Sequence, residues 1–275
     1  MKDLRRYWRL FLFFVKVGLM KQMAYRPHFF LMITGKVIRI ALLFFFFQAI
    51  FFKVSRIGEW TWEQVLLLFA TFHVVDYMMS ITFGRNLSSH LPSRVQTGEM
   101  DYRMILPANL LFFASLEDVD MMDFFSFLPT LGFLGWVLWR LDMAIPPLQV
   151  VLYILLIANA LVFLYAVILA IATTSFWTTQ SYGLAVIFDN LMKIGRYPLD
   201  IFEGFWKVVF IYFVPLVLIA QVPAQALLGA LSPGFVLFAF GVSGTALALA
   251  LAFWRRGVKN YMSGSSGAQG IGYRV

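Results

Sequence analysis

Two ionisable residues in the middle of a long apolar stretch are the first candidates for chemistry. Within WEQVLLLFATFHVVDYMMSIT (62–82), His73 and Asp76 lie three residues apart, so a helix would place them on one face. Ionisable groups among apolar residues are costly to bury, and they often bind or move a substrate. The structural alternative is a hydrogen-bonded pair between helices, or a contact of Asp76 with Lys36 or Arg39 from the preceding apolar stretch. The sequence leaves both interpretations open.

A second group is the run of acids in LEDVDMMDFF, which contains Glu117, Asp118, Asp120 and Asp123. Metal-dependent enzymes that act on lipids gather carboxylates, but this run lacks the spaced aspartates and glycines that such enzymes present. We therefore expect a solvated start of a helix, where the helix dipole favours negative charge.

The rest of the chain offers no catalytic motif. The patterns G-x-x-x-x-G-K-[ST], H-E-x-x-H, G-x-S-x-G and G-x-G-x-x-G are all absent. There is no cysteine, and the three histidines His28, His73 and His90 have no metal-ligand spacing. We expect no catalytic residue, no metal site and no cofactor bound by this chain.

Composition defines the class of protein to which these residues belong. The chain has 275 residues, of which 61% are hydrophobic and 13% are charged, whereas soluble domains carry about 25% charged residues. Apolar runs of about 20 residues recur along the whole length, which is typical of membrane-spanning helices. The expected fold class is an all-α polytopic membrane protein. The net charge of +8 comes from basic residues that flank apolar runs, which favours contact with anionic lipid over nucleic acid.

Six membrane-spanning helices are predicted, over residues 34–53, 62–82, 121–139, 147–172, 205–222 and 232–254. In the first, Lys36 and Arg39 would each cost roughly 2.5–3.5 kcal/mol at the bilayer centre. We therefore expect this span to start near Gly35, with both cations reaching the headgroups. Segment 175–195 is more polar than the six, and we expect it to form a helix at the cytoplasmic surface of the membrane.

The regions outside the spans are assigned by charge. Residues 1–27 are predicted to form an amphipathic interfacial helix, because their basic residues fall in a stripe about 100° wide. Residues 28–254 would form the transmembrane domain, and residues 255–275 a C-terminal tail whose end, SGSSGAQGIGYRV, we expect to be extended or disordered. Lysine and arginine are distributed 17 against three between the two sides that six spans imply. The positive-inside rule then places both termini and the 83–118 loop in the cytoplasm.

Three stretches resemble a known family. The loop reads VQTGEMDYRMILPANLL, the fifth-span region reads RYPLDIFEGFWKVVFIYFVPLVLIAQVPAQALLG, and the sixth span ends in FWRRGVKNYMSGSSG. In this order they resemble the permease subunits of bacterial ATP-binding-cassette (ABC) exporters of the type-2 class, especially six-span permeases for drugs or small molecules. The resemblance covers nearly the whole chain. One departure is Leu106 before Pro107, where the family usually has an Arg-Pro step.

The resemblance implies a partner-driven transporter in the bacterial cytoplasmic (inner) membrane. Such a permease pairs with a second permease, identical or a sister subunit, and with two cytoplasmic ATPase subunits that bind ATP and Mg²⁺. It also implies a coupling helix after the second span and a partly re-entrant segment between the last two spans. The proline-containing QVPAQALLGALSPG (221–234) suits that re-entrant segment. Nucleic acid is not an expected partner.

The polar stretch RVQTGEMDYRMILPANL (94–110) gains a role from this resemblance. We expect residues 88–104 to form a short amphipathic helix that lies in a groove of the ATPase, with Gly98 at a turn. Charged contacts would come from Arg94, Glu99, Asp101 and Arg103, and apolar anchors would be Met100 and Tyr102. The alternative is a solvated loop between two helices.

The function that follows is a non-catalytic permease of an ATP-driven exporter. An amphipathic or hydrophobic substrate is expected, because the spans offer few polar groups. The alternatives are export of a lipid-linked polysaccharide, an integral-membrane enzyme acting on lipids, and a membrane scaffold. In the sixth span, small residues recur from Gly241 to Ala252. They would allow close helix packing, either within the chain or between protomers.

Overall fold

The computed structural model describes residues 2–24, 26–178 and 181–268, with side chains described for 5–22, 30–178 and 183–261. Within these ranges the chain is helical, apart from turns and one isolated β-bridge between Ile57 and Trp60. Five of the described helices are long and apolar enough to cross a membrane. They are α2 (Arg26–Phe51), α3 (Trp62–Met79), α7 (Met121–Arg140), α8 (Pro147–Thr173) and α12 (Pro233–Ala268). The all-α polytopic class is confirmed.

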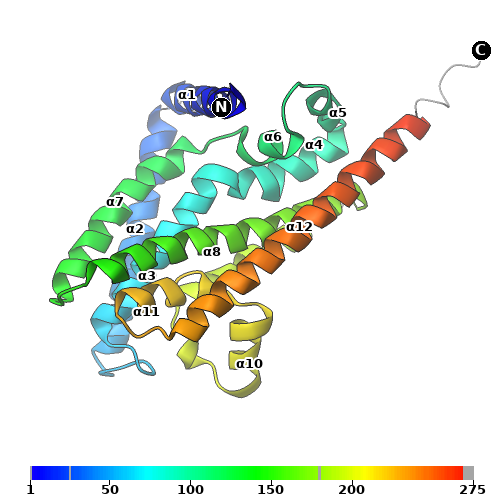
Figure 1. Cartoon of the computed structure of the whole chain (residues 1–275). Helices are drawn as coiled ribbons and strands as arrows, with labels where there is room; N and C mark the ends of the chain where they lie inside the picture. The colour runs from blue at the N-terminus through cyan, green and yellow to red at the C-terminus, as the bar shows by residue number, and fades with distance from the viewer. Residues whose placement is uncertain (1, 25, 179–180, 269–275) are drawn as a thin grey trace, which may run out of the picture.

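The long helices run between two ends of the molecule (Figure 1). One end, which we call the basic end, carries α1 (Lys2–Ala24), α4 (Leu91–Thr97), α5 (Glu99–Met104), α6 (Leu110–Leu116) and the last turns of α12. The opposite end carries residues 52–61, α10 (Gly204–Val208) and α11 (Gln221–Leu227). Helix α1 lies across the basic end, and its Phe14 packs with Phe113 and Val119. Its apolar side therefore contacts the rest of the chain.

Local signals in the sequence explain where the long helices begin. The Gln64 side chain accepts a hydrogen bond from the backbone N–H of Thr61, at 3.0 Å, just before α3. The Asp120 carboxylate accepts a hydrogen bond from the backbone N–H of Met122, at 3.0 Å, and so caps α7. Helix α8 begins at Pro147, and proline is well tolerated at the first position of a helix.

Helix α2 begins earlier than expected. The sequence places the start of the membrane span near Gly35, and the helix that contains this span already begins at Arg26. We expected the Lys36 ammonium group to reach the lipid headgroups. In the structure it forms an ion pair with Asp123 of α7. Because a paired charge costs less to bury than an isolated one, the helix can extend past this lysine. Arg39, one turn further, is exposed.

Helix α3 does not end at the edge of the apolar stretch. Two π-helical turns, Ser80–Gly84 and Asn86–His90, follow it directly and lead into α4. The helical path is therefore continuous from Trp62 to Thr97. The predicted 83–118 loop is largely helical in consequence. Such π-turns often occur at functional sites.

The fifth crossing lies elsewhere than the sequence indicated. Helix α9 (Ser181–Met192) and the short 3₁₀ turns Lys193–Arg196 and Leu199–Ile201 lead from the basic end to the opposite end. Phe188 lines a cavity together with Ser88 near the basic end. Tyr197 packs against Phe47, with ring centroids 5.7 Å apart, and Asp200 accepts a hydrogen bond from Trp60 Nε1 at 2.9 Å. Residues 181–201 thus connect the two ends of the molecule, a course that we had assigned to residues 205–222, and α9 runs between these ends where we had expected a surface helix over 175–195; we infer that 181–201 make the fifth crossing.

Residues 204–230 form a broken segment at the opposite end instead of a span. After α10 come a π-turn, Val209–Phe213, a 3₁₀ turn, Leu216–Leu218, and then α11. Pro215 lies at the break, and a proline within a helix removes a backbone hydrogen bond. Short helices that turn back at one end are consistent with the re-entrant segment expected over 221–234. The last residues of that range already belong to α12, which begins at Pro233.

Helices α8 and α12 pack against each other along much of their length. The packed face of α12 includes the buried Ala239, Ser243 and Ala250, and Asn159 of α8 donates a hydrogen bond to the carbonyl of Ala239 at 3.3 Å. Gly241 and Gly244 lie on the exposed face. The helix continues to Ala268, so the first part of the expected extended tail is helical. Residues 269–275 lie outside the described part of the chain.

Candidate coupling site

The polar stretch after α3 forms a protruding pair of short helices at the basic end. Helix α4 ends at Gly98, whose φ of +76° and ψ of 0° are left-handed, and α5 begins at the next residue. A residue with a side chain would be strained in this conformation, whereas glycine adopts it readily. The predicted single helix over 88–104 is therefore two helices joined by a glycine turn. We call residues 98–105 the tip.

The exposed side chains of the tip are partly those that the sequence indicated. Glu99, Asp101 and Tyr102 are exposed, and Tyr102 is 65% accessible. Met100, expected to be an apolar anchor for a partner, is 0% accessible and belongs to the main hydrophobic core. It anchors the tip to its own chain. Ile105, which the sequence analysis did not select, is 77% exposed, and only the fold shows that this isoleucine faces outward.

The acids from Glu117 to Asp123, which we call the acidic cluster, lie at the start of a helix as expected, with Asp120 capping α7 and Asp123 in its first turn, but they are not solvated. Asp120 and Asp123 are buried. Each member forms an ion pair with a cation from another part of the chain. The pairs are Glu117 with Arg94 (3.0 Å) and Arg103 (2.7 Å), Asp118 with Lys21 (2.9 Å), Asp120 with Arg85 (2.5 Å) and Asp123 with Lys36. The cluster therefore connects α1, α2, the π-turns, α4 and α5 to the start of α7.

Glu117 holds both arginines that the sequence had assigned to a partner. Arg103 donates from Nε and Nη2 to the two carboxylate oxygens, at 2.7 and 3.1 Å. These hydrogen bonds raise the pKa of Arg103 above its usual value. Burial lowers the pKa of Arg94, and the nearby Glu117 carboxylate opposes that effect. Both side chains are mostly buried: Arg94 is 11% accessible and Arg103 is 14% accessible. They therefore hold the tip in place and contribute little to its exposed surface.

A buried amide fixes the acidic cluster to the helix that carries the tip. The Asn86 side chain donates to the carbonyl oxygens of Thr82 (2.9 Å) and Asp118 (2.7 Å), and it accepts from the backbone N–H of Asp118 at 3.1 Å. Asn86 is fully buried. A buried amide with its hydrogen bonds made holds two segments in one register.

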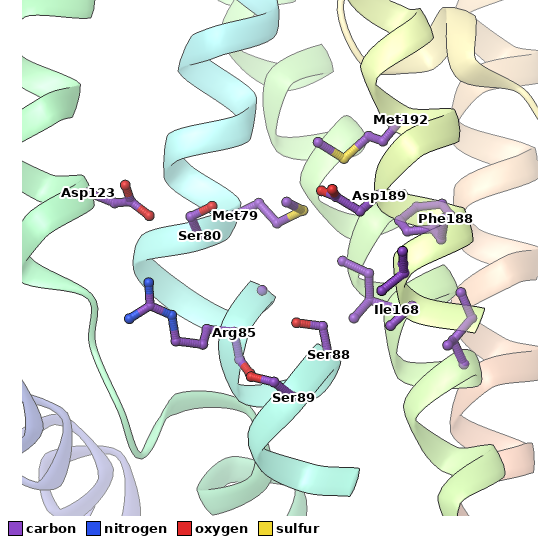
Figure 2. Close-up of a pocket in the computed structure, with 14 residues that line it drawn as sticks. Met79, Ser80, Arg85, Ser88, Ser89, Asp123, Ile168, Phe188, Asp189 and Met192 are labelled. Atoms are coloured by element: carbon purple, nitrogen blue, oxygen red, sulfur yellow. The ribbon is translucent and has the colours of Figure 1, made fainter. Parts of the chain in front are cut away.

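A cavity of about 340 Å³ lies between the π-turns and α9. Figure 2 shows Arg85 and Asp123 on one side of it and Asp189 and Phe188 on the other. Its polar wall also contains Ser80, Ser88 and Ser89, and its apolar wall includes Met79, Ile168 and Met192. Since Arg85 and Asp123 also belong to the ion pairs of the acidic cluster, a change in the cluster would change the wall of this cavity.

His73 and Asp76, which the sequence places on one helix face, are not hydrogen-bonded to each other. His73 is 2% accessible, and neither ring nitrogen has a hydrogen-bond partner. Asp76 is half-buried on the same helix. Lys36 pairs with Asp123 instead of Asp76, and its ammonium group lies 5.6 Å from the centre of the Tyr77 ring. The hydrogen-bonded alternative for His73 is therefore wrong.

Among the described residues, no group of three or more histidine, cysteine, aspartate or glutamate side chains could hold a metal ion. What the described chain does provide is a set of membrane-crossing helices, one of which runs directly into a protruding helical tip. This arrangement defines a polytopic membrane protein with an element that a partner can engage.

The family follows from a match over most of the chain. The model of the ABC-2 family transporter proteins matches residues 37–265. This range contains α3, the tip, the acidic cluster and most of α12. The chain therefore belongs to the ABC-2 transporter family and is a membrane permease component of an ABC transporter, which works with an ABC ATPase subunit. A comparison with curated proteins gave no match.

Proposed function

We propose that this permease exports an amphipathic or hydrophobic substrate and takes its energy from a cytoplasmic ATPase that engages the tip. Two ATPase subunits, which bind ATP and Mg²⁺, would serve a pair of permeases in the bacterial inner membrane. The basic end would face the cytoplasm, together with both termini. This chain would then contribute no catalytic residue and bind no cofactor of its own.

The observation that carries the proposal is the continuous helical path from Trp62 to Thr97. A force applied at the tip would reach the end of this helical path through the single turn at Gly98. The tip offers Tyr102 and Ile105 as apolar contacts and Glu99 and Asp101 as charged contacts. An exposed aromatic flanked by charges is typical of a protein interface.

The acidic cluster would spread the motion to other helices. Arg94 and Arg103 connect the tip to Glu117, and the same acidic run pairs with α1, α2 and the π-turns. Closure of the ATPase pair on ATP would displace the tip and change which of these pairs are made. The helices would then exchange between two arrangements, as rigid-body transporter transitions require.

The contact between tip and ATPase can be tested by cross-linking. The chain has no cysteine, so Tyr102→Cys introduces a unique thiol, which can carry a benzophenone-maleimide. The permease is purified from its native membrane with the ATPase that accompanies it, and then irradiated. We expect a permease–ATPase adduct that maps to residue 102.

The matched control is Phe205→Cys. The native Phe205 side chain lies at the opposite end and is 72% exposed. We expect no adduct with the ATPase from this position. If the ATPase remains bound but cross-links only from position 205, or from neither position, the tip is not the contact. Purification of the permease without any ATPase would contradict the proposal as a whole.

A further inference from the structure

The cavity of about 340 Å³ between the π-turns and α9, which we call the α9 cavity, has walls of two kinds. Cavities of roughly 300–1,000 Å³ are typical of small-molecule sites. The polar part of the wall contains Ser80, Arg85, Ser88, Ser89, Asp123 and Asp189, and the apolar part includes Met79, Ile168, Val186, Phe188 and Met192. A molecule that matches both parts carries a polar group and an apolar group.

Charges of opposite sign line the α9 cavity from opposite sides. Figure 2 shows Arg85 on the π-turns at one side and Asp189 on α9 at the other. Both groups are accessible, because 56% of the Arg85 side chain and 57% of the Asp189 side chain are exposed. A ligand in the cavity can therefore contact both.

The guanidinium group of Arg85 keeps hydrogen-bond donors for a ligand. A guanidinium carries five N–H groups. Arg85 Nη2 pairs with Oδ2 of Asp120 at 2.5 Å, while Asp120 Oδ1 accepts a hydrogen bond from the backbone N–H of Met122. Asp120 therefore does not hold its arginine with both oxygens, as Glu117 holds Arg103. The remaining N–H groups of Arg85 suit the oxygens of a phosphate.

The ion pair of Asp189 is easily exchanged for a ligand. Its partner is Lys193, one helical turn along, at 2.6 Å and with a side chain that is 44% exposed. Exposed ion pairs contribute little to stability. Lys193 also donates a hydrogen bond to the Asn190 side chain at 3.2 Å, so it keeps a partner when Asp189 binds a ligand. The carboxylate is therefore available to an ammonium group.

A ligand with only one sign of charge would match one side of the cavity and not the other. An anion would bind Arg85 but would cover Asp189 without supplying a cation, and an ammonium group alone would do the reverse. Covering a charge without an adequate partner costs free energy. The two sides together favour a zwitterionic group, and the three serine hydroxyls add donors for its phosphate oxygens.

The apolar part of the wall continues onto the surface of α9. Val186 lines the cavity and is 41% exposed, and its neighbour Ile187 is 58% exposed. In a membrane-crossing helix such side chains contact acyl chains. An apolar chain can therefore lie against α9 while the polar group to which it is attached occupies the cavity.

We propose that the α9 cavity binds a zwitterionic amphipath of the phospholipid type. Arg85 and the serines contact its phosphate, Asp189 contacts its ammonium group, and its apolar chain lies against α9. This inference rests on the proposed function only in taking the ligand as the transported substrate. Binding is measured on the permease without the ATPase, so a failure to bind would leave the contact between tip and ATPase intact, and the reverse also holds.

The test compares probes that differ in one group. Myristoyl lysophosphatidylethanolamine carries the phosphate, the ammonium group and one chain. In myristoyl lysophosphatidylpropanol a methyl group replaces the ammonium group, and glycerophosphoethanolamine lacks the chain. Each is titrated into the purified full chain in dodecyl maltoside, and the molecules bound per chain are counted by native mass spectrometry.

We expect saturable binding of both lysolipids at a single site. The Kd should be about tenfold lower for the ethanolamine lysolipid than for the propanol lysolipid, as one charge-assisted hydrogen bond allows. Glycerophosphoethanolamine should show no saturable binding over the same concentrations, because it makes no contact with the apolar wall.

Three variants assign the contacts. Asp189→Asn keeps the size of the side chain and removes its charge, so the difference between the two lysolipids should disappear. Arg85→Gln should weaken both lysolipids about tenfold and preserve the ratio between them. The matched control is Asp142→Asn, which changes an exposed acid between α7 and α8 that does not line the cavity. It should bind both lysolipids like the native chain. A misfolded variant would lose both lysolipids, so the ratio reports the Asp189 contact separately from folding.

Equal Kd values for the two lysolipids in the native chain would overturn the proposal. The same conclusion would follow if Asp189→Asn left their ratio unchanged, or if Asp142→Asn also removed it. Unaltered affinities in Arg85→Gln would contradict the phosphate contact. Binding of glycerophosphoethanolamine as tight as that of the lysolipid would show a site for a free headgroup and would contradict an amphipathic ligand.

Discussion

Glu117 shows how a single side chain can organise the base of the tip. Its carboxylate pairs with Arg94 and Arg103 at once, and it lies on the segment that leads into α7. Without this residue, two mostly buried guanidinium groups at the base of the tip would lose their charged partner. Removing one member of a buried ion pair is more costly than removing an exposed pair.

Glu117→Gln is therefore expected to loosen the tip. The substitution keeps the size of the side chain and removes its charge, which should lower the local stability of residues 91–104 by about 2 kcal/mol. We expect faster amide hydrogen exchange over these residues and a loss of substrate-stimulated ATP hydrolysis in the complex. The matched control for hydrogen exchange is Glu99→Gln, which removes the exposed partner of the same arginine; the Glu99 side chain is 61% accessible. An exposed pair contributes less than about 1 kcal/mol, so equal acceleration of hydrogen exchange in the two variants would contradict this role of Glu117.

At the scale of elements, the sequence predicted those helices whose apolar length alone identifies them. The predicted spans over 62–82, 121–139 and 147–172 correspond closely to α3, α7 and α8. Helix α1 follows from its basic stripe. The acidic cluster was misjudged because its cations come from segments far away in sequence, as with Lys21 and Asp118. A pattern of acids alone cannot show such partners.

The fifth crossing was missed for a related reason. Asp189 and Lys193 make this segment too polar for a hydropathy criterion, but they lie one helical turn apart and form an ion pair of 2.6 Å. Arg196 lies over the Tyr197 ring, 5.5 Å from its centroid. Such local pairing lowers the cost of each charge, whereas the more apolar stretch from 205 to 222 is broken at Pro215.

The course of the fifth crossing can be tested by labelling two positions. Trp177 lies before α9 and Phe205 lies after it, with 50% and 72% exposure. Trp177→Cys and Phe205→Cys should react with a membrane-impermeant maleimide from opposite sides of the membrane, measured in intact and permeabilised cells. The sequence-based assignment, with a span starting at 205, predicts the same side for both. Labelling of both from one side would therefore contradict the structure and favour that assignment.

For the whole molecule, moving the fifth crossing to residues 181–201 leaves the number of membrane crossings even. If residues 181–201 replace 205–222 as one crossing, α1 and the last described turns of α12 still lie on the same side of the membrane. Lys207 moves to the opposite end, and Lys193 and Arg196 move into the crossing. The distribution of lysine and arginine changes from 17 against three to 14 against four. The bias still favours a cytoplasmic basic end.

That orientation is the condition under which a cytoplasmic ATPase could reach the tip. Phe52 lies in the connection between α2 and α3 at the opposite end and is 91% exposed, and Tyr102 lies on the tip. In intact cells, an impermeant maleimide should label Phe52→Cys and spare Tyr102→Cys, which should react only after the membrane is permeabilised. Both thiols are unique, because the native chain has no cysteine, and denatured protein provides the reference for complete reaction. Labelling of Tyr102→Cys in sealed cells, with Phe52→Cys protected, would place the tip outside the cell, where no ATP-driven subunit could act on it.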